Sequence, residues 1–172
     1  MLKIYLGEDE IKERIKVLAD EIRRDIKDKK DVVFIANLKG SIIFFSDILR
    51  ELSDCDVMID FISTESYSGK ETTGNIKIVR DISLDIYGKE VVLFEDIVDT
   101  GLTLQSLVRY INEIHKPASL KLAVLLDKPS RRLVDLKIDY VGFVIENYFV
   151  VGYGMDYNEK YRNLPYIAVL DL

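Results

Sequence analysis

The stretch VVLFEDIVDTGLT, residues 91–103, decides the predicted fold and the predicted site. It begins as an apolar, β-branched run, which predicts a buried strand, and passes two acids, Glu95 and Asp96. Residues 99–103 then form a turn, in which Gly101 permits backbone geometry that a side chain would hinder. The helix that follows presents free N–H groups, and two threonine hydroxyls add donors. The stretch therefore predicts a phosphate-binding turn that needs no lysine.

An alternative is an ordinary strand-to-helix turn in which Thr100 or Thr103 caps the helix. The two preceding acids favour ligand binding, because they could contact ribose hydroxyls or a magnesium ion that neutralises a polyphosphate. The stretch lacks the G-K-[ST] of a Walker loop and the G-x-G-x-x-G of a dinucleotide-binding turn.

Outward from this stretch, predicted strands alternate with predicted helices. The strands are 32–38, 56–63, 75–82, 91–97, 121–126, 140–145 and 166–170, and the helices are 8–28, 41–52 and 103–115. This alternation predicts an α/β fold with a mostly parallel twisted sheet flanked by helices, in a single domain over residues 1–172. In such sheets ligands bind beyond the carboxyl ends of the strands.

Composition and charge restrict the function classes. The 172 residues carry 24 Lys and Arg against 30 Asp and Glu, a net charge of −6, which disfavours binding to nucleic acid or to anionic membranes. The single cysteine, Cys55, lies between Asp54 and Asp56, where negative charge disfavours a thiolate. No apolar run approaches the ~20 residues that span a bilayer. We expect a soluble, cytoplasmic protein.

The 91–103 stretch resembles the phosphoribosyl-pyrophosphate signature of type I phosphoribosyltransferases: four apolar residues, an acidic pair, two apolar residues, then D-T-G-x-T. Further segments look like the hypoxanthine-guanine branch, and together they cover about residues 5 to 170. They are LKG (38–40), SYSGKETTG (66–74), LLDKPSRR (125–132), FVVGYGMDYNEKYR (149–162) and LPYI (164–167). The resemblance also implies a small hood or lid region beside the sheet.

The resemblance implies an enzyme of purine salvage. It would transfer the 5-phosphoribosyl group of phosphoribosyl pyrophosphate to a 6-oxopurine, hypoxanthine or guanine, giving IMP or GMP and pyrophosphate, with Mg²⁺ as cofactor. Asp99 would be the catalytic residue, a general base or acid at purine N7. The residue-level alternative for Asp99 is a helix N-cap.

The resemblance also assigns the phosphate contacts. Thr100, Gly101 and Thr103 would hold the 5′-phosphate, with Leu102 in the variable position of the signature. Glu95 and Asp96 would meet the ribose hydroxyls, directly or through magnesium. Pyrophosphate would lie against a loop formed by Lys39 and Gly40, whose amide faces it if the peptide before Lys39 is cis, and against Arg162 as a bidentate donor.

On the purine side, Lys128 would donate to the 6-oxo group, which favours 6-oxopurines over adenine. Phe149 would stack on the base. The backbone of Val150 and the side chain of Asp156 would complete the purine edge and a second magnesium position. The lid loop would include Ser66 and Tyr67, and its closure would exclude water. Without the resemblance, Lys128 reads as a solvated turn residue and Phe149 as a core aromatic.

Two other functions remain open. One is a regulator of the same fold that binds nucleic acid, against which the acidic charge, Asp99 and Lys128 argue. The other is a pyrimidine or adenine phosphoribosyltransferase, which the segments around Lys128 and Phe149 disfavour. The motifs leave the choice among hypoxanthine, guanine and xanthine open. His115 receives no catalytic role, and the resemblance suggests a homodimer or homotetramer.

Overall fold

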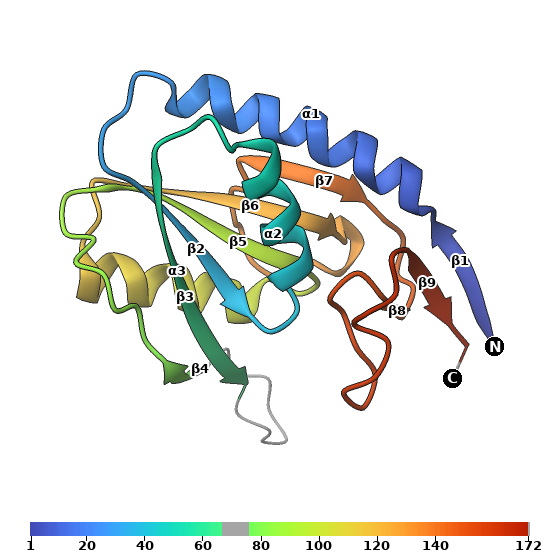
Figure 1. Ribbon diagram of the computed structural model, residues 1–172. Coiled ribbons are helices and arrows are strands. Elements are labelled where there is room, and N and C mark those ends of the chain that lie inside the picture. Colours follow the sequence, from blue (N-terminus) through green and yellow to red (C-terminus); the bar gives the residue numbers. More distant parts are fainter. Residues whose placement is uncertain (67–75, 172) are drawn as a thin grey trace.

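The protein is described here by a computed structural model, which covers residues 1–66 and 76–171. Helices cover both faces of a central sheet, and a smaller sheet stands at one side (Figure 1). The strands are β1 (Leu2–Leu6), β2 (Val32–Leu38), β3 (Val57–Ser66), β4 (Ile76–Arg80), β5 (Glu90–Val98), β6 (Ser119–Asp127), β7 (Tyr140–Val144), β8 (Val150–Val151) and β9 (Ile167–Leu170). The helices are α1 (Glu8–Ile26), α2 (Ile42–Glu51) and α3 (Leu102–Tyr110), with short helical turns at Ile111–His115 and Pro129–Arg131.

The central sheet has the strand order β4-β3-β2-β5-β6-β7. All neighbours in it run parallel except β4, which pairs antiparallel with β3. From β2 the chain crosses to β3 on one side, whereas β5 lies on the other side of β2. The order of the strands therefore reverses between β2 and β5, and ligands of open α/β sheets bind at this point, beyond the carboxyl ends of the strands.

The core has two layers. On one face, α1 and α2 cover the sheet around an aromatic cluster, in which the Phe94 ring lies 5.1 Å from Phe45 and 5.2 Å from Phe34. On the other face, α3 packs Leu104 and Leu107 against the opposite side chains of β2 and β5. The even burial of β2 on both faces explains its unbroken apolar sequence. The predicted α/β fold with a mostly parallel sheet is confirmed.

The smaller sheet is antiparallel, with the order β1-β9-β8. It brings the two ends of the chain together, since Leu2 on β1 is paired with Leu170 on β9 (Figure 1). This sheet and the loops around it form the hood that the sequence suggested. The strands β1 and β8 were not among the predicted elements. β8 has only two residues, too few for a periodic pattern, and β1 buries only its last residue, Leu6.

Some predicted boundaries differ from the observed ones. The predicted helix 103–115 is α-helical only to Tyr110 and then widens into a π-helical turn that ends at Lys116, where φ is +49°. The predicted lid begins at the end of β3, and Tyr67 lies outside the described residues. In the described part of the chain, no helix combines the length and the apolar character needed to cross a membrane.

Candidate active site at the carboxyl ends of the strands

The turn between β5 and α3 has the geometry that the sequence predicted. Gly101 lies in the left-handed region at φ +82°, and a Cβ there would come within 2.8 Å of Arg132 Cδ. Glycine is therefore required both by the backbone and by the close approach. Within the described residues, no side chain caps α3; Thr100 Oγ1 accepts only a long 3.4 Å hydrogen bond from Leu102 N. The structure does not support the capping alternative for this turn.

Asp99 and Lys128 lie side by side, although they follow different strands. Lys128 comes directly after β6, and its backbone N–H donates to Val98 O on β5 at 3.0 Å. Its Nζ lies 3.9 Å from Asp99 Oδ2, and Arg131 Nε donates to Asp99 Oδ1 at 3.0 Å. The Lys128 side chain is only 7% exposed. Burial lowers the pKa of Lys128, and the Asp99 charge only partly opposes that shift.

The acidic pair at the end of β5 is poorly supplied with donors. Asn37 Nδ2 donates to Glu95 Oε2 at 2.8 Å, and Ile97 N donates to Asp96 Oδ1 at 2.8 Å. Burial and the neighbouring Asp96 charge raise the pKa of Glu95 well above its ordinary value, and burial also raises the pKa of Asp96. Two adjacent carboxylates of this kind are suited to a hard divalent cation.

The loop after β2 packs directly on this pair. The Leu38–Lys39 peptide, whose conformation the sequence left open, is cis. A Cβ on Gly40 would lie 1.7 Å from Asp96 Oδ2, so only glycine fits there. On the other side of the loop, Gly154 has φ +102°, and a Cβ on it would lie 2.0 Å from Gly40 O. The hood and the β5 acids therefore enclose this loop from two sides.

Four charged side chains meet beside this loop. Arg162 pairs with Asp156 at 2.8 Å and with Glu159 at 3.3 Å, and its NH1 donates to Gly154 O at 2.8 Å. Lys39 Nζ reaches the same Glu159 oxygen at 3.1 Å. Hydrogen bonds from Lys39 and Arg162 lower the pKa of Glu159.

The segment expected to hold the purine runs from the end of β7 to β8. It starts next to Lys128, because Ile145 N donates to Asp127 O at 2.8 Å. Val150 is buried, whereas Phe149 is 44% exposed, with its ring 5.7 Å from that of Tyr157 in an edge-on arrangement. Phe149 is thus an accessible aromatic ring. The alternative, in which Phe149 is an aromatic residue of the core, is wrong.

The structure brings together Asp99 with Lys128, Gly40 with Asp96, and Lys39 with Arg162 through Glu159. Three residues of the site were not among the predicted ones: Asn37, Arg131 and Glu159. Asn37 is the one polar residue near the end of the apolar strand 32–38, which is a usable signal, whereas no local pattern marks Arg131 or Glu159. Their importance comes from contacts with residues 32 and 120 positions away in the sequence.

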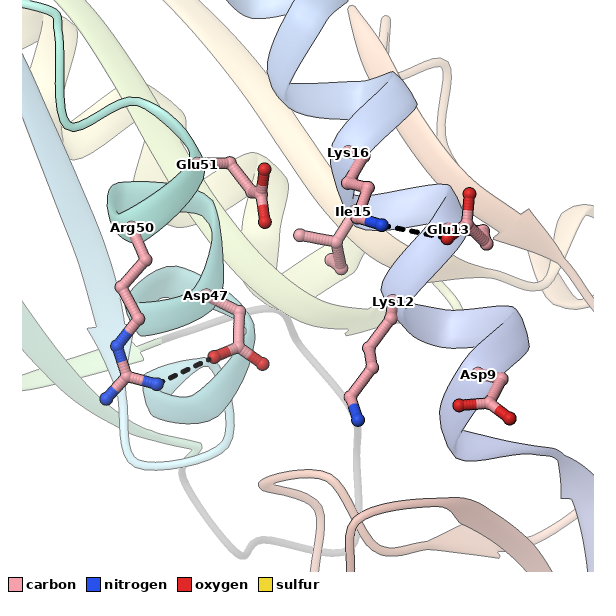
Figure 2. A pocket seen from close by; sticks show the side chains of 8 residues that line it. All are labelled: Asp9, Lys12, Glu13, Ile15, Lys16, Asp47, Arg50 and Glu51. Atoms are coloured by element: carbon pink, nitrogen blue, oxygen red, sulfur yellow. Dashed lines mark hydrogen bonds and ion pairs between the residues drawn. The ribbon is translucent and has the colours of Figure 1, made fainter.

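A separate groove lies between α1 and α2 (Figure 2). This groove of about 490 Å³ is lined largely by charged side chains, and several of them neutralise one another. Glu13 pairs with Lys16 at 2.9 Å and Asp47 with Arg50 at 3.4 Å (Figure 2). No predicted site residue is among the described residues that line it. This groove is therefore separate from the candidate site at the carboxyl ends of the strands.

Comparisons with known proteins agree with this geometry. The family described as "Phosphoribosyl transferase domain" matches residues 4–158. The chain is 45% identical to the hypoxanthine phosphoribosyltransferase of Escherichia coli, over 97% of this chain and 94% of the relative. A crystal structure of a hypoxanthine-guanine phosphoribosyltransferase from Bacillus anthracis superposes with a TM-score of 0.94 at 48% identity, covering 99% of this chain and 100% of that one.

The chain is also 43% identical to the bifunctional protein TilS/HprT of Listeria monocytogenes, over 98% of this chain. It spans only 26% of the length of that relative. Since both the family match and the full-length relatives cover nearly all of the chain, the protein belongs to the phosphoribosyltransferase family, in its hypoxanthine-guanine branch.

Proposed function

We propose that the protein transfers the 5-phosphoribosyl group of phosphoribosyl pyrophosphate to a 6-oxopurine, hypoxanthine or guanine, and releases pyrophosphate. The observation that carries this proposal is the pairing of Asp99 with the buried Lys128, whose charged groups lie 3.9 Å apart beside the Gly101 turn. On a 6-oxopurine, N7–H and the 6-oxo group are neighbours. At this spacing the Asp99 carboxylate can accept from N7–H while the Lys128 ammonium donates to the 6-oxo group of the same base.

Asp99 acts as the general base in nucleotide formation. Purine N9 forms a bond to C1′ of the ribose, the bond from C1′ to the pyrophosphate oxygen breaks, and the proton at N7 passes to the Asp99 carboxylate. Arg131 already holds Oδ1 of this carboxylate at 3.0 Å, which leaves Oδ2, on the Lys128 side, for the proton. Positioned proton transfer contributes about 10²–10⁴-fold to a rate.

Lys128 selects the base. A buried ammonium donor is satisfied by a 6-oxo group and is left unpaired by the 6-amino group of adenine, which costs free energy. Phe149 supplies an exposed ring for stacking, and the backbone of Val150 with Asp156 completes the purine edge. Asp156 would also offer a carboxylate oxygen to a second magnesium ion, as the family resemblance implies, although in this structure that carboxylate pairs with Arg162 at 2.8 Å.

The phosphate groups are held at the switch point of the sheet. Thr100, Gly101, Leu102 and Thr103 bind the 5′-phosphate through the helix start, since anions are favoured there. Lys39, Gly40 and Arg162 bind the pyrophosphate. Ser66 and Tyr67 belong to the lid that excludes water from the reacting C1′.

The acidic pair fits a magnesium ion. Glu95 and Asp96 are adjacent hard-oxygen donors with raised pKa values and few internal hydrogen bonds, so a divalent cation relieves their repulsion. Magnesium held there would neutralise charge on the phosphoribosyl pyrophosphate, since proteins commonly bind this ion with one or two carboxylates together with substrate oxygens. Glu95 and Asp96 also orient the ribose hydroxyls.

We further propose a single domain over residues 1–172 that works as a homodimer or homotetramer in the cytoplasm. The single cysteine supports the reducing compartment, and burial, followed by the Asp54 charge, raises the pKa of the Cys55 thiol, which makes it unreactive. Gel filtration with light scattering measures the oligomeric state, and a monomer at micromolar concentration contradicts that part of the proposal.

The function is tested by mixing the protein with magnesium, phosphoribosyl pyrophosphate and one base at a time: hypoxanthine, guanine, xanthine, adenine or uracil. Pyrophosphate release is the measurement. We expect turnover with hypoxanthine or guanine and little with adenine or uracil. Turnover with adenine or uracil alone would indicate the other branches of the family, and no turnover with any 6-oxopurine contradicts the proposal.

A further inference from the structure

Arg162 has few free donors for an incoming anion. Its NH1 donates to Gly154 O at 2.8 Å, and its NH2 lies 2.8 Å from Asp156 Oδ1 and 3.3 Å from Glu159 Oε2. Its Nε is buried and, among the described residues, has no hydrogen-bond partner. A bidentate contact to pyrophosphate therefore requires Arg162 to give up one of its carboxylate partners.

Lys39 is occupied by the same group. Its Nζ lies 3.1 Å from Glu159 Oε2, the same oxygen that Arg162 NH2 contacts. A single carboxylate oxygen thus stands between the side chains of two residues assigned to the pyrophosphate. The two cations and the two acids, Asp156 and Glu159, cancel in charge, so the cluster offers no net positive charge to an anion.

Glu159 is the acid that can leave. Its side chain is 66% exposed, whereas that of Asp156 is 28% exposed. Asp156 is also tied to the loop by a second contact, since its Oδ2 accepts a 2.8 Å hydrogen bond from Glu159 N. Exposed ion pairs are weak, so the contacts of Glu159 are the ones that a strongly charged ligand displaces at the lowest free-energy cost.

We propose that the Glu159 carboxylate is an internal substitute for pyrophosphate: it holds the Lys39 and Arg162 side chains in the ligand-free enzyme, and the pyrophosphate group displaces it. This inference rests on the proposed function. When pyrophosphate leaves after the reaction, Glu159 returns to the two cations and competes with rebinding. Glu159 therefore sets the affinity for pyrophosphate and for the pyrophosphate end of the substrate, without touching the purine.

The test compares Glu159→Gln with the unaltered protein. Isothermal titration with magnesium pyrophosphate is expected to show about three- to tenfold tighter binding in the variant, because one or two exposed ion pairs no longer compete. The KM for phosphoribosyl pyrophosphate falls by a similar factor, while the KM for hypoxanthine stays unchanged. A Glu159 that merely stabilised the loop would not produce this split between the two KM values.

Two further variants serve as controls. Glu13→Gln breaks an equally exposed pair, Glu13 with Lys16 at 2.9 Å, in the α1/α2 groove (Figure 2), and should leave pyrophosphate affinity unchanged. In a Lys39→Met background the gain from Glu159→Gln should shrink, because one of the two contested cations is absent. An equal gain in both backgrounds contradicts competition for Lys39.

A failure of the proposed function and a failure of Glu159 as a competitor give different binding results. If the unaltered protein does not bind magnesium pyrophosphate, the proposed function is contradicted. If it binds, and Glu159→Gln binds equally or more weakly, Glu159 is not a competitor and the inference alone is overturned. Glu159 is an exposed loop residue, and a circular dichroism spectrum checks that the variant is folded.

Discussion

Two sets of carboxylates in the same sheet have opposite surroundings. Asp60 on β3 is buried and accepts hydrogen bonds from the backbone N–H groups of Phe61, Ser83 and Leu84 at 2.7–2.8 Å, and from the Ser83 hydroxyl. Burial alone would raise the pKa of Asp60, but these hydrogen bonds outweigh it and lower the pKa. Glu95 and Asp96 on β5 accept fewer hydrogen bonds, from Asn37 Nδ2 and from Ile97 N, and these do not offset burial, so the pKa values of both acids are raised.

This difference separates a structural acid from acids that await a ligand. Asp60 is satisfied by the protein itself and ties the loop before β5 to β3. Glu95 and Asp96 repel each other and gain most from a cation that the protein does not supply. Asp99, Lys128 and the loop at Gly40 resemble Glu95 and Asp96 in this respect. Their contacts within the protein leave room for a ligand or compete with one.

The largest expected effect is at Asp99. Asp99→Ala should lower kcat by about 10²–10⁴-fold, because the proton acceptor is lost, while binding of magnesium pyrophosphate changes little. Steady-state kinetics and isothermal titration measure the two quantities. Near-normal turnover would place Asp99 with the structural acids, and loss of pyrophosphate binding would show that it supports the phosphate loop instead.

Lys128→Met should lower kcat/KM for hypoxanthine roughly 10- to 150-fold, the effect of one charged hydrogen bond. The pKa of Lys128 is lowered in the folded protein, so the unfolded chain holds its proton more tightly, and the charged lysine destabilises the fold at neutral pH. The variant should therefore unfold at an equal or higher temperature than the unaltered protein. A parallel loss of activity and stability would make Lys128 a structural residue.

Gly40→Ala tests the contact between the pyrophosphate loop and the acidic pair. Its Cβ would lie 1.7 Å from Asp96 Oδ2, and the displacement should raise the KM for phosphoribosyl pyrophosphate about 5- to 100-fold. Gly7→Ala is the matched control, because among the described residues, its two chain neighbours aside, no atom lies within 4 Å of its Cβ position. The KM for hypoxanthine should change less; an equal rise in both would indicate a general distortion of the site.

The smallest effect on activity is expected at Asp60. Asp60→Asn should cost about 1–3 kcal/mol in the free energy of unfolding, measured by urea denaturation at neutral pH, with both KM values unchanged. The folded-state pKa of Asp60 is lowered, so its contribution is present above the ordinary carboxyl pKa and is lost as the pH falls through the lowered value. The difference between variant and unaltered protein should shrink accordingly in acid.

Glu95→Gln tests the opposite pH dependence of stability, measured by urea denaturation over the same pH range as for Asp60→Asn. The pKa of Glu95 is raised, so the folded protein loses stability as the pH rises from the ordinary carboxyl range through that raised value. Without magnesium, the variant should therefore be at least as stable as the unaltered protein at neutral pH. If Glu95→Gln and Asp60→Asn lower stability alike, the contrast between the two sets of acids is wrong.

Much of the architecture was predictable because it depends on local periodicity. The apolar runs at 32–38 and 91–97 became the central strands β2 and β5, and the stripe from Ile11 to Ile26 became the buried face of α1. The strands of the hood were harder to predict from the sequence. β8 has only two residues, and β1 pairs with β9 at the opposite end of the chain, so no local pattern predicts either strand.

The sequence by itself determined the fold class, the phosphate-binding turn at 99–103 and, through family resemblance, the residues to examine for each substrate. The tertiary structure decided which side chains contact each of these site residues. That Arg131 holds Asp99, that Asn37 holds Glu95 and that Glu159 occupies Lys39 and Arg162 depends on contacts between residues far apart in the chain. The physical reason is that a turn or a strand forms from neighbouring residues, whereas the charge balance of a site is set by side chains that only the folded sheet brings together.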